Sequence, residues 1–490
     1  MKKVNSLRFS PKDNVAVALE AAEAGGVMEF EGNTVVLQEP LSRGFKAALR
    51  PLHKGEKIIK YGEEIGVAAR EIRAGEHVHC DNIASALTGE LHAAPWSAPR
   101  YPEAGAALPD FYGYKRKNGR VGIRNELWLI PTVGCINGLL RAAVKAFPLP
   151  EGITAVRVLE HPWGCSQLGG DLENTRKVLA ALAHNPNAAG VLMASLGCEN
   201  LEPDSMSELL SDVENLRTVV LQQEDDDFAA IHSALCELAK KARTERTLCP
   251  GSSLVFGIKC GGSDALSGIT ANPLVGRVTD AFTAAGASVV MGEIPEIFGA
   301  EKGLLARCAT PQVHEALVRT LRSFRDYFTG HGQPVFENPS PGNKAGGIST
   351  LEEKSLGAVS KSGHSVITEV LGYGERLSEK GLSVVCCPGN DLVSSTAMAA
   401  AGAVMILFTT GRGTPFGTVV PTLKIATNSA LAAKKAGWTD FDASRVITEG
   451  MEPVVSALIE KMMKTASGAE TRSEELGIAD ISIFKDGVIL

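Results

Sequence analysis

The chain has 490 residues, of which 44% are apolar, and its formal net charge is -7 with a pI near 5.9. This length exceeds one ordinary hydrophobic core, so two or three domains are expected. The scattered acidic excess and the 5% aromatic content argue against nucleic-acid and anionic-membrane partners. The N-terminus lacks the apolar segment of a signal peptide, and the longest nearly uncharged apolar run, 397–408, is too short to cross a bilayer. These features predict a cytoplasmic protein.

Residues 1–85 are predicted to form a small, mostly β domain. Turn residues such as Gly25-Gly26 and Gly62 separate its short apolar segments. We expect a short helix at 14–24 and strands at 27–30, 34–37, 57–61, 65–67 and 77–79. His77 and His79 are two residues apart and would share one face of a strand. Such a pair can bind a metal or act as acid and base, and two exposed polar residues at a strand end are the alternative.

Four prolines among alanines in 86–112 predict an extended linker. Apolar strand candidates then alternate with amphipathic helices through 113–250, which predicts an α/β domain. The strands are expected at 126–133, 154–159, 190–196 and 218–222, and the helices follow them up to 147, at 173–184 and at 227–243.

Residues 251–490 repeat this alternation, with strands expected at 254–258, 288–291, 382–386 and 404–409 and a helix at 274–285. Each strand ends in a loop of small and polar residues: CGGSD, GEIPE, PGND and TGRGTP. Such loops build the sites of open α/β sheets, at the carboxyl ends of the strands. The segment 337–357 is predicted to be an irregular, ordered site loop.

Cysteines next to glycine follow several of these strands, at Cys135, Cys165, Cys198 and Cys260. Thiolates at helix N-termini bind metals readily, and four of them could hold an iron–sulfur cluster. The alternative is that cysteine is simply a small residue that fits a tight turn. The absence of CxxC pairs argues against a structural zinc site.

Carboxylates and cations also occur in these loops. Glu293, Glu296 and Asp391 could ligate a divalent ion or move a proton, although Asp391 suits a helix N-cap equally well. Lys344 and Arg412 lie in glycine-rich backbone that suits recognition of a substrate carboxylate, and a solvated surface charge is the alternative for each. The sequence contains no GxGxxG after a strand, GxxxxGK[ST], HExxH or GxSxG, which disfavours a nucleotide cofactor and the NTPase, zincin and esterase classes. The remaining pattern favours a small, polyhydroxylated, anionic substrate held with a metal ion.

Several long segments carry a family resemblance: RKNGRVGIRNELWLIPTVGCIN, GCSQLGGD, LGCEN, CGGSDALSGITANP, EIPEIFGAE, NPSPGNKAGGISTLEEKSLG, CCPGND and TGRGTPFG. From about residue 14 to the C-terminal FKDGVIL the chain resembles the altronate/galactarate dehydratase family, and GEHVHCDN resembles that family's β-clip (SAF-type) domain. The resemblance implies an α/β fold with a small β-clip domain (1–85), a linker (86–112), an α/β domain with a possible dimerisation role (113–250) and a Rossmann-like catalytic domain (251–490).

The resemblance also implies the reaction. The family's hydro-lyases remove water from a sugar acid, giving 2-dehydro-3-deoxy-D-gluconate from D-altronate in hexuronate catabolism. They use iron(II), with manganese(II) as a substitute, and a homodimer is expected. Galactarate or another sugar acid, a sulfo-lyase reaction on the same scaffold, and a non-catalytic sugar-acid sensor are the alternatives.

A metal-assisted β-elimination fits these residues. We expect the metal near Cys260, Glu293, Glu296 and Asp391, with Lys344 and Arg412 positioning the substrate. Ser263, Asp264, Asn272 and Asn390 are predicted to bind substrate, and Cys135, Cys165 and Cys198 are kept as candidate thiolate ligands. His79, together with His77, is predicted to act as acid or base, carried by a mobile N-terminal domain.

Overall fold

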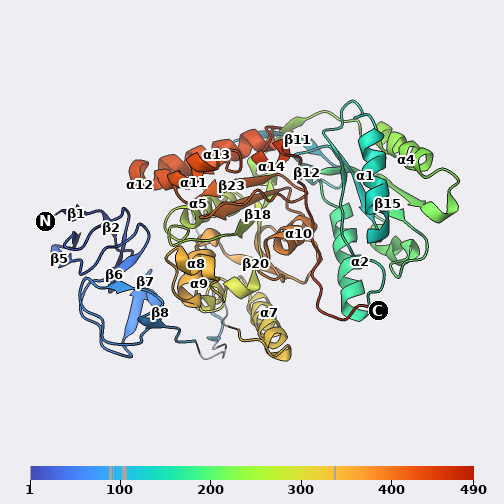
Figure 1. Ribbon diagram of the computed structural model, residues 1–490. Helices are drawn as coiled ribbons and strands as arrows, with labels where there is room; N and C mark the ends of the chain where they lie inside the picture. The colour runs from blue at the N-terminus through green and yellow to red at the C-terminus, as the bar shows by residue number, and fades with distance from the viewer. Residues whose placement is uncertain (1, 88–90, 92, 102–106, 336–337) are drawn as a thin grey trace.

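The structure is a computed structural model that describes residues 2–87, 91, 93–101, 107–335 and 338–490. It has three parts, and their order in space differs from their order in the sequence. The N-terminal β part lies at one end, the C-terminal part is central, and the middle of the sequence forms the other end (Figure 1). The predicted α/β class with a small N-terminal β domain is confirmed. Of the predicted linker 86–112, residues 88–90, 92 and 102–106 lie outside the described residues.

The N-terminal part consists of short strands in three small sheets, ordered β1-β4-β5, β10-β8-β7 and β2-β3-β6-β9. Its strands are β1 (Lys3–Val4), β2 (Ser6–Leu7), β3 (Val15–Ala18), β4 (Val27–Phe30), β5 (Asn33–Val36), β6 (Lys46–Ala48), β7 (Lys57–Lys60), β8 (Glu63–Ala68), β9 (His77–Val78) and β10 (Ile83–Ala84). The helix predicted at 14–24 is wrong. The Val-Ala-Val-Ala run of β3 is buried on both faces between β2 and β6, where β-branched side chains pack well.

The middle part, at the far end in Figure 1, is built on four parallel strands in the order β14-β13-β15-β16. The strands are β13 (Glu126–Pro131), β14 (Val156–Val158), β15 (Ala188–Ser195) and β16 (Leu216–Val220), and the main helices are α1 (Asn137–Ala146), α2 (Gly169–Ala183) and α4 (Asp227–Ala242). All four predicted strands and all three predicted helices are present. A small antiparallel sheet of β11 (Phe111–Lys115), β12 (Val121–Gly122) and β17 (Thr247–Cys249) was not predicted.

The central part holds seven parallel strands in the order β20-β21-β19-β18-β22-β23-β24. They are β18 (Val255–Cys260), β19 (Ser288–Met291), β20 (Ile367–Leu371), β21 (Gly381–Val385), β22 (Met405–Thr410), β23 (Thr422–Ala426) and β24 (Phe441–Asp442). Its main helices are α5 (Ala271–Ala284), α7 (Pro311–Gly330), α10 (Asp391–Ala401) and α13 (Met451–Ala466). The four predicted strands are those nearest the middle of the sheet, where both faces are buried and the apolar runs are longest.

The predicted irregular loop 337–357 contains two helices instead, α8 (Pro341–Ala345) and α9 (Leu351–Val359). Ser340 caps α8 in a capping box with Asn343, and Thr350 caps α9 by accepting from the backbone N–H of Glu353. The prediction of an irregular loop was therefore wrong for the described residues, because these caps stabilise two short helices between the turn residues. Glu337, the first residue of that prediction, lies outside the described residues.

The two α/β parts present the carboxyl ends of their strands on the same side. Helices α2 and α10 pack together, and the Asn185 amide just after α2 donates to the carbonyls of Ala399 and Ala403 near the end of α10, at 2.9 Å each. The two helices therefore end together, and their N-termini, which follow the carboxyl ends of strands, also lie on one side. None of the helices in the described residues is long and apolar enough to cross a membrane.

Candidate active site

A glutamate held by two buried lysines lies at the carboxyl end of the central sheet. Strand β18 ends in Lys259 and Cys260, and Glu293 follows β19, its neighbour in the sheet. Both carboxylate oxygens of Glu293 are engaged, one by Lys259 Nζ and the other by Lys361 Nζ at 2.9 Å. All three side chains are at most 1% exposed. We call Lys259, Glu293 and Lys361 the inner centre.

The inner centre also contacts Cys260 and Asp391. Lys361 Nζ lies 3.4 Å from Cys260 Sγ, and Lys259 Nζ lies 2.9 Å from Asp391 Oδ1. Asp391 begins α10, and its side chain is 34% exposed. The backbone of Glu293 is left-handed, with φ of 63°, which turns the carboxylate back under β18. The centre thus reaches the surface through Asp391.

Charge pairing sets the protonation of this centre. Burial alone would raise the pKa of Glu293, but the ammonium groups of Lys259 and Lys361 lower it well below its usual range. Burial opposes charge on Lys259 and Lys361 too, yet their acidic neighbours raise the pKa of each. Burial and then the Glu293 charge raise the pKa of the Cys260 thiol. At neutral pH the centre therefore holds two ammonium groups, an ionised glutamate and a protonated thiol.

A cavity of about 480 Å³ opens above the inner centre. Among the predicted site residues, its lining includes Cys260, Ser263, Glu296 and Asp391. Glu296 Oε1 accepts from Lys354 Nζ at 2.9 Å, and Lys354 also donates to Asn338 Oδ1 at 2.6 Å. Glu296 Oε2 is buried and has no hydrogen-bond partner among the described residues. The cavity therefore has a thiol and carboxylate at one side and a Lys–Glu–Asn group at another.

Three of the predicted substrate-binding residues hold the backbone instead. Asp264 accepts from Ser267 Oγ at 3.0 Å and Thr427 Oγ1 at 3.0 Å, which ties two loops together. Asn272 donates to the carbonyl of Gly357 at 2.8 Å and is 1% exposed. Asn390, and not Asp391, caps α10, because its Oδ1 accepts from the backbone N–H of Leu392 and of Val393. Asp391 is thereby free of the capping role that the sequence left open for it.

The two predicted substrate cations lie outside this lining. Arg412 is exposed and donates to the carbonyl of Gly342 at 3.3 Å, which places it beside α8. Lys344 lies on α8 as well and acts electrostatically on Cys80 of the N-terminal part. Asn343 of the same helix lines the cavity and donates to the carbonyl of Ser263 at 2.8 Å. Both cations are therefore on the helix, or next to the helix, that forms one wall of the cavity.

The histidine pair lies where the N-terminal part meets the 343–353 segment. The rings of His77 and His79 stack with centroids 5.4 Å apart, and each is 5.3 Å from the ring of Phe45. Next to them Cys80 Sγ lies 3.6 Å from the carbonyl oxygen of Ser349. Neither histidine is among the residues that line the cavity described above.

A second glutamate between two lysines holds the parts together there. Glu353 of α9 accepts from Lys46 Nζ at 2.8 Å and from Lys60 Nζ at 2.7 Å, and all three side chains are 1% exposed. We call Lys46, Lys60 and Glu353 the docking centre. Burial, and after it the charge of Lys46, lowers the pKa of His79 to about 4 and also lowers that of His77. Both rings are therefore neutral at neutral pH.

The predicted metal ligands do not fit a resident cation in this arrangement. Both oxygens of Glu293 are engaged by ammonium groups, and Cys260 is protonated and bound to one of them. In the described ranges of the chain, no group of three or more His, Cys, Asp or Glu is placed to hold a metal ion. Iron(II) and manganese(II) remain predictions from the family resemblance, and no chemical step is derived through them.

The three other candidate thiolates lie on the middle part. Cys135, Cys165 and Cys198 are exposed and follow β13, β14 and β15, three neighbouring strands. The four thiols do not meet as one group, because Cys260 belongs to the other sheet and is buried.

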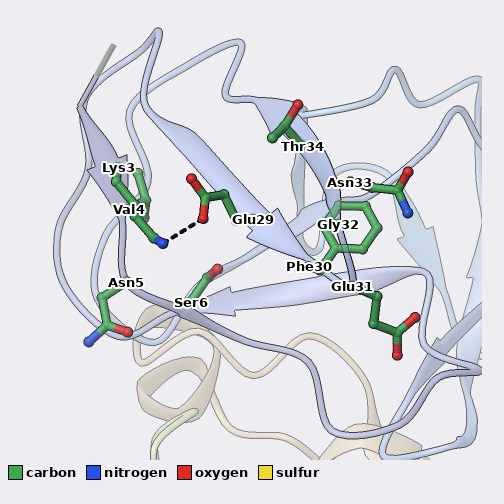
Figure 2. Close-up of a pocket in the computed structure, with 10 residues that line it drawn as sticks. All are labelled: Lys3, Val4, Asn5, Ser6, Glu29, Phe30, Glu31, Gly32, Asn33 and Thr34. Atoms are coloured by element: carbon green, nitrogen blue, oxygen red, sulfur yellow. Dashed lines mark hydrogen bonds and ion pairs between the residues drawn. The ribbon is translucent and has the colours of Figure 1, made fainter.

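A separate hollow of about 430 Å³ lies on the N-terminal part (Figure 2). It is lined by β1 and the β4–β5 hairpin, and an exposed ion pair between Lys3 and Glu29 crosses it at 2.5 Å. No predicted site residue lines it. We assign it no role.

Sequence reasoning missed the lysines of both centres and Lys354. Lys259 carried a signal, because a charged residue inside the apolar run VFGIKC must be buried with a partner. Lys354 lies within the quoted motif STLEEKSLG, whereas Lys361 follows α9 with no pattern that marks it.

Three family models match the chain. They are the Altronate/galactarate dehydratase SAF domain over residues 4–86, the D-galactarate dehydratase/Altronate hydrolase second domain over 113–244, and the D-galactarate/Altronate dehydratase C-terminal domain over 251–489. The chain belongs to the D-galactarate/altronate dehydratase family, as its motifs predicted.

Within the family, the chain differs in its sequence identity to altronate and galactarate dehydratases. The chain is 45% identical to the altronate dehydratase of Escherichia coli (strain K12) and 44% identical to that of Bacillus subtilis (strain 168), with 99% of both chains covered in each case. It is 33% identical to the galactarate dehydratase (L-threo-forming) of Escherichia coli (strain K12), over 96% of this chain and 95% of that one.

Proposed function

We propose that the chain is a hydro-lyase that removes water from altronate to give a 2-keto-3-deoxy acid. The observation that carries this proposal is the cavity at the carboxyl edge of the central sheet, where an acid, a thiol and buried ammonium groups converge. Identity of 44–45% over nearly the full length with altronate dehydratases, against 33% with a galactarate dehydratase, supports altronate as the substrate.

The reaction requires removal of the C2 proton and departure of the C3 hydroxyl. Asp391 is the carboxylate that reaches the cavity, and we assign it the C2 proton. The electron pair of the C2–H bond first forms an enolate with the substrate carboxylate and then becomes the C2–C3 double bond, as the C3 hydroxyl takes a proton and leaves as water. The Cys260 thiol lines the same cavity and is protonated at neutral pH, so it can donate that proton. The resulting enol then takes its keto form.

Positive potential stabilises the intermediate. Proton loss next to an ionised carboxylate creates a dianionic enolate, which preorganised cations favour. Lys259 lies directly behind Asp391, and Lys354 lies in the cavity wall. The buried Glu296 Oε2 is an acceptor suited to a substrate hydroxyl. Lys344 and Arg412, beside α8, stay candidates for the substrate carboxylate.

A substrate panel tests the proposal. Altronate, galactarate, gluconate and sulfolactate are incubated with the chain with and without air, with added iron(II) or manganese(II), and 2-keto acid and sulfite are measured. We expect 2-keto acid from altronate at a kcat/KM at least tenfold above the other substrates. Turnover of galactarate in preference to altronate, or release of sulfite from sulfolactate, would contradict the assignment.

Assembly and location are part of this proposal. A homodimer, with 113–250 contributing to its interface, is the assembly that the family resemblance predicts. Light scattering of the purified chain tests it. Cell fractionation tests the predicted cytoplasmic location.

A further inference from the structure

The last ten residues of the chain, 481–490, run from the central part to the middle part beside α2, and we call them the tail (Figure 1). Near its start, the backbone N–H of Ser482 donates to Thr396 Oγ1 of α10 at 3.0 Å. At its other end, the backbone N–H of Leu490 donates to the carbonyl of Ser166, in the loop before α2, at 3.0 Å. The tail therefore spans the joint between the two α/β parts.

A buried carboxylate of the middle part anchors the tail. Asp171 lies in the first turn of α2, and its side chain is 3% exposed. Its Oδ1 accepts from the backbone N–H of Asp486 and its Oδ2 from that of Gly487, at 2.8 Å each. Lys485 Nζ lies 3.4 Å from the same carboxylate. Among the described residues, the hydrogen-bond and ion-pair partners of this carboxylate all belong to the tail, so the tail is what satisfies a buried polar group there.

The tail also packs against the end of α7. The ring of Phe484 meets that of Tyr327 edge-on, with centroids 5.5 Å apart, and its centroid lies 6.1 Å from that of Tyr373. The Tyr373 hydroxyl accepts from the backbone N–H of Phe484 at 2.8 Å. His331 directly follows α7, and its Nδ1 lies 2.9 Å from the carbonyl oxygen of Tyr327 and its Nε2 lies 2.9 Å from Asp486 Oδ1. A ring contact and a histidine bridge thus tie the last turn of α7 to the tail.

The same end of α7 forms an apolar wall of the cavity above the inner centre. The wall consists of Phe324, Tyr327 and Phe328 of α7 and of Pro334 and Val335 after it. Apolar and aromatic side chains supply most of the contact area of a ligand site, and a few polar groups orient the ligand. Phe324 is buried, whereas Tyr327 and Phe328 in the last turn are half-buried. Because helix ends open most easily, the position of this wall depends on what packs against it from outside.

We propose that Phe484 and Asp171 are positioning residues for substrate binding. Phe484 holds the last turn of α7 where Tyr327 lines the cavity, and Asp171 holds the tail that carries Phe484. Neither residue is among those that line the cavity, so each acts through Tyr327. The inference rests on the proposed function in one respect, namely that this cavity receives the substrate.

The apolar wall and the reacting groups lie on different elements, which predicts how the kinetics change. Asp391 and Cys260 lie on α10 and β18, whereas the wall lies on α7. A wall that contacts the substrate and the transition state alike contributes to KM and not to kcat. Loosening the wall should therefore raise KM and leave kcat within about twofold of the wild type. General loss of folded enzyme would instead lower the apparent kcat and leave KM unchanged.

Steady-state kinetics of the full chain on altronate test the two residues. Phe484→Ala should raise KM about fivefold, as expected for the loss of one aromatic contact, and Asp171→Ala should raise it to a similar extent. Phe484→Tyr keeps the ring and should restore the wild-type KM. Glu173→Ala is the matched control, because that carboxylate of α2 pairs with Arg176 and Lys177 of its own helix. An unchanged KM in both alanine variants, or a loss confined to kcat, would overturn the proposal.

Hydrogen exchange without substrate tests the positioning itself, whichever substrate the chain takes. In Phe484→Ala, the backbone amides of 324–335 should exchange about fivefold faster than in the wild type, and those of 391–401 in α10 should keep the wild-type rate. Wild-type exchange over 324–335 would overturn the proposal. If the chain turns over no substrate of the panel, the proposed function fails, and this exchange result alone decides whether Phe484 positions the wall. If Asp171→Ala does not fold, Phe484→Ala decides both measurements.

Discussion

Two glutamates of this chain, Glu293 and Glu353, have the same immediate chemistry and different surroundings. Each places its two carboxylate oxygens on two separate buried lysines. In the inner centre a second carboxylate, Asp391, shares Lys259 and balances the charge. In the docking centre two ammonium groups share Glu353. In the inner centre, the charges of Lys259 and Lys361 are therefore balanced by those of Glu293 and Asp391, beside a cavity. In the docking centre, Glu353 balances only one of its two lysines, which leaves an excess of positive charge beside two histidines.

This difference is reflected in the neighbouring groups. Burial lowers the pKa of Lys46, and the Lys60 charge adds to this against the Glu353 carboxylate, whereas the Glu353 charge raises the pKa of Lys60 despite its burial. Burial, and after it the Lys46 charge, lowers the pKa of His77 and His79. In the inner centre, by contrast, both lysines have a raised pKa. The same Lys–Glu–Lys arrangement thus raises the pKa of both lysines where a second acid is present, and of only one lysine where it is not. The following single-residue variants test the two centres independently.

Glu293→Gln should have the largest effect. It leaves two buried ammonium groups without their shared carboxylate, and breaking a buried pair costs about 3–5 kcal/mol. We expect loss of measurable turnover and a matching drop in the free energy of unfolding, measured by denaturant titration. If the variant does not fold, Cys260→Ser provides the test, with turnover reduced and stability changed by about 1 kcal/mol or less. Normal turnover in a folded Glu293→Gln chain would contradict the role of the inner centre.

Asp391→Asn should reduce kcat by about 10²–10⁴, the range for loss of a general base. Stability should change little, because the side chain is partly exposed and does not cap α10. Asn390→Ala is the control. It removes the N-cap and should cost about 1 kcal/mol of stability with a much smaller effect on kcat. Equal loss of kcat in both variants would mean that turnover depends on the structure of the α10 N-terminus and not on the Asp391 carboxylate.

Glu353→Gln should release the N-terminal part with the central sheet intact. Removing the carboxylate leaves Lys46 and Lys60 buried without a counter-charge, at a cost of about 3 kcal/mol localised at this interface. We expect faster proteolysis between 86 and 112 and a fall in kcat/KM, while the main unfolding transition is retained. Glu352→Gln on the same helix is the comparison, since its Oε1 accepts hydrogen bonds from Ser85 and Ala86 and it forms no ion pair with a lysine of the described residues. Proteolysis at the wild-type rate would show that the docking centre does not hold the two parts together.

The smallest expected effect is a pH dependence from His79. An unfolded histidine has a pKa near 6.5, and that of His79 in the folded chain is about 4. The unfolded state therefore binds the proton first, and stability is lost as pH falls from about 6.5 to 4. Because the ring is only half-buried, we expect about 1 kcal/mol of this loss to disappear in His79→Gln, measured by denaturant titration at several pH values. An acid limb of kcat/KM near pH 6.5 in the wild type would contradict a neutral histidine pair.

The sequence predicted the middle of each α/β sheet, and four of its predicted site residues, Cys260, Ser263, Glu296 and Asp391, are among those that line the cavity. Long apolar runs such as that ending at Cys260 are buried on both faces, so pattern alone identifies them. The error at Val15–Ala18 arose because four short apolar residues fit helix and strand equally well until their partners β2 and β6 are known. The lysine pairing of Glu293 could not be predicted, because Lys361 comes from a turn about 70 residues later and only tertiary packing brings it there. The sequence also could not decide whether Asn390 or Asp391 caps α10, because that choice depends on the local backbone conformation.

The docking centre also bears on how the N-terminal part moves. Three charges leave water together when Lys46 and Lys60 close on Glu353, and separating them by one or two ångströms would strand those charges in a medium that solvates them poorly. Partly opened arrangements are therefore higher in energy than either limit. We therefore expect the N-terminal part to exchange between a closed and a fully open position across an energy barrier. A substrate that needs access at this interface could enter only from the fully open position.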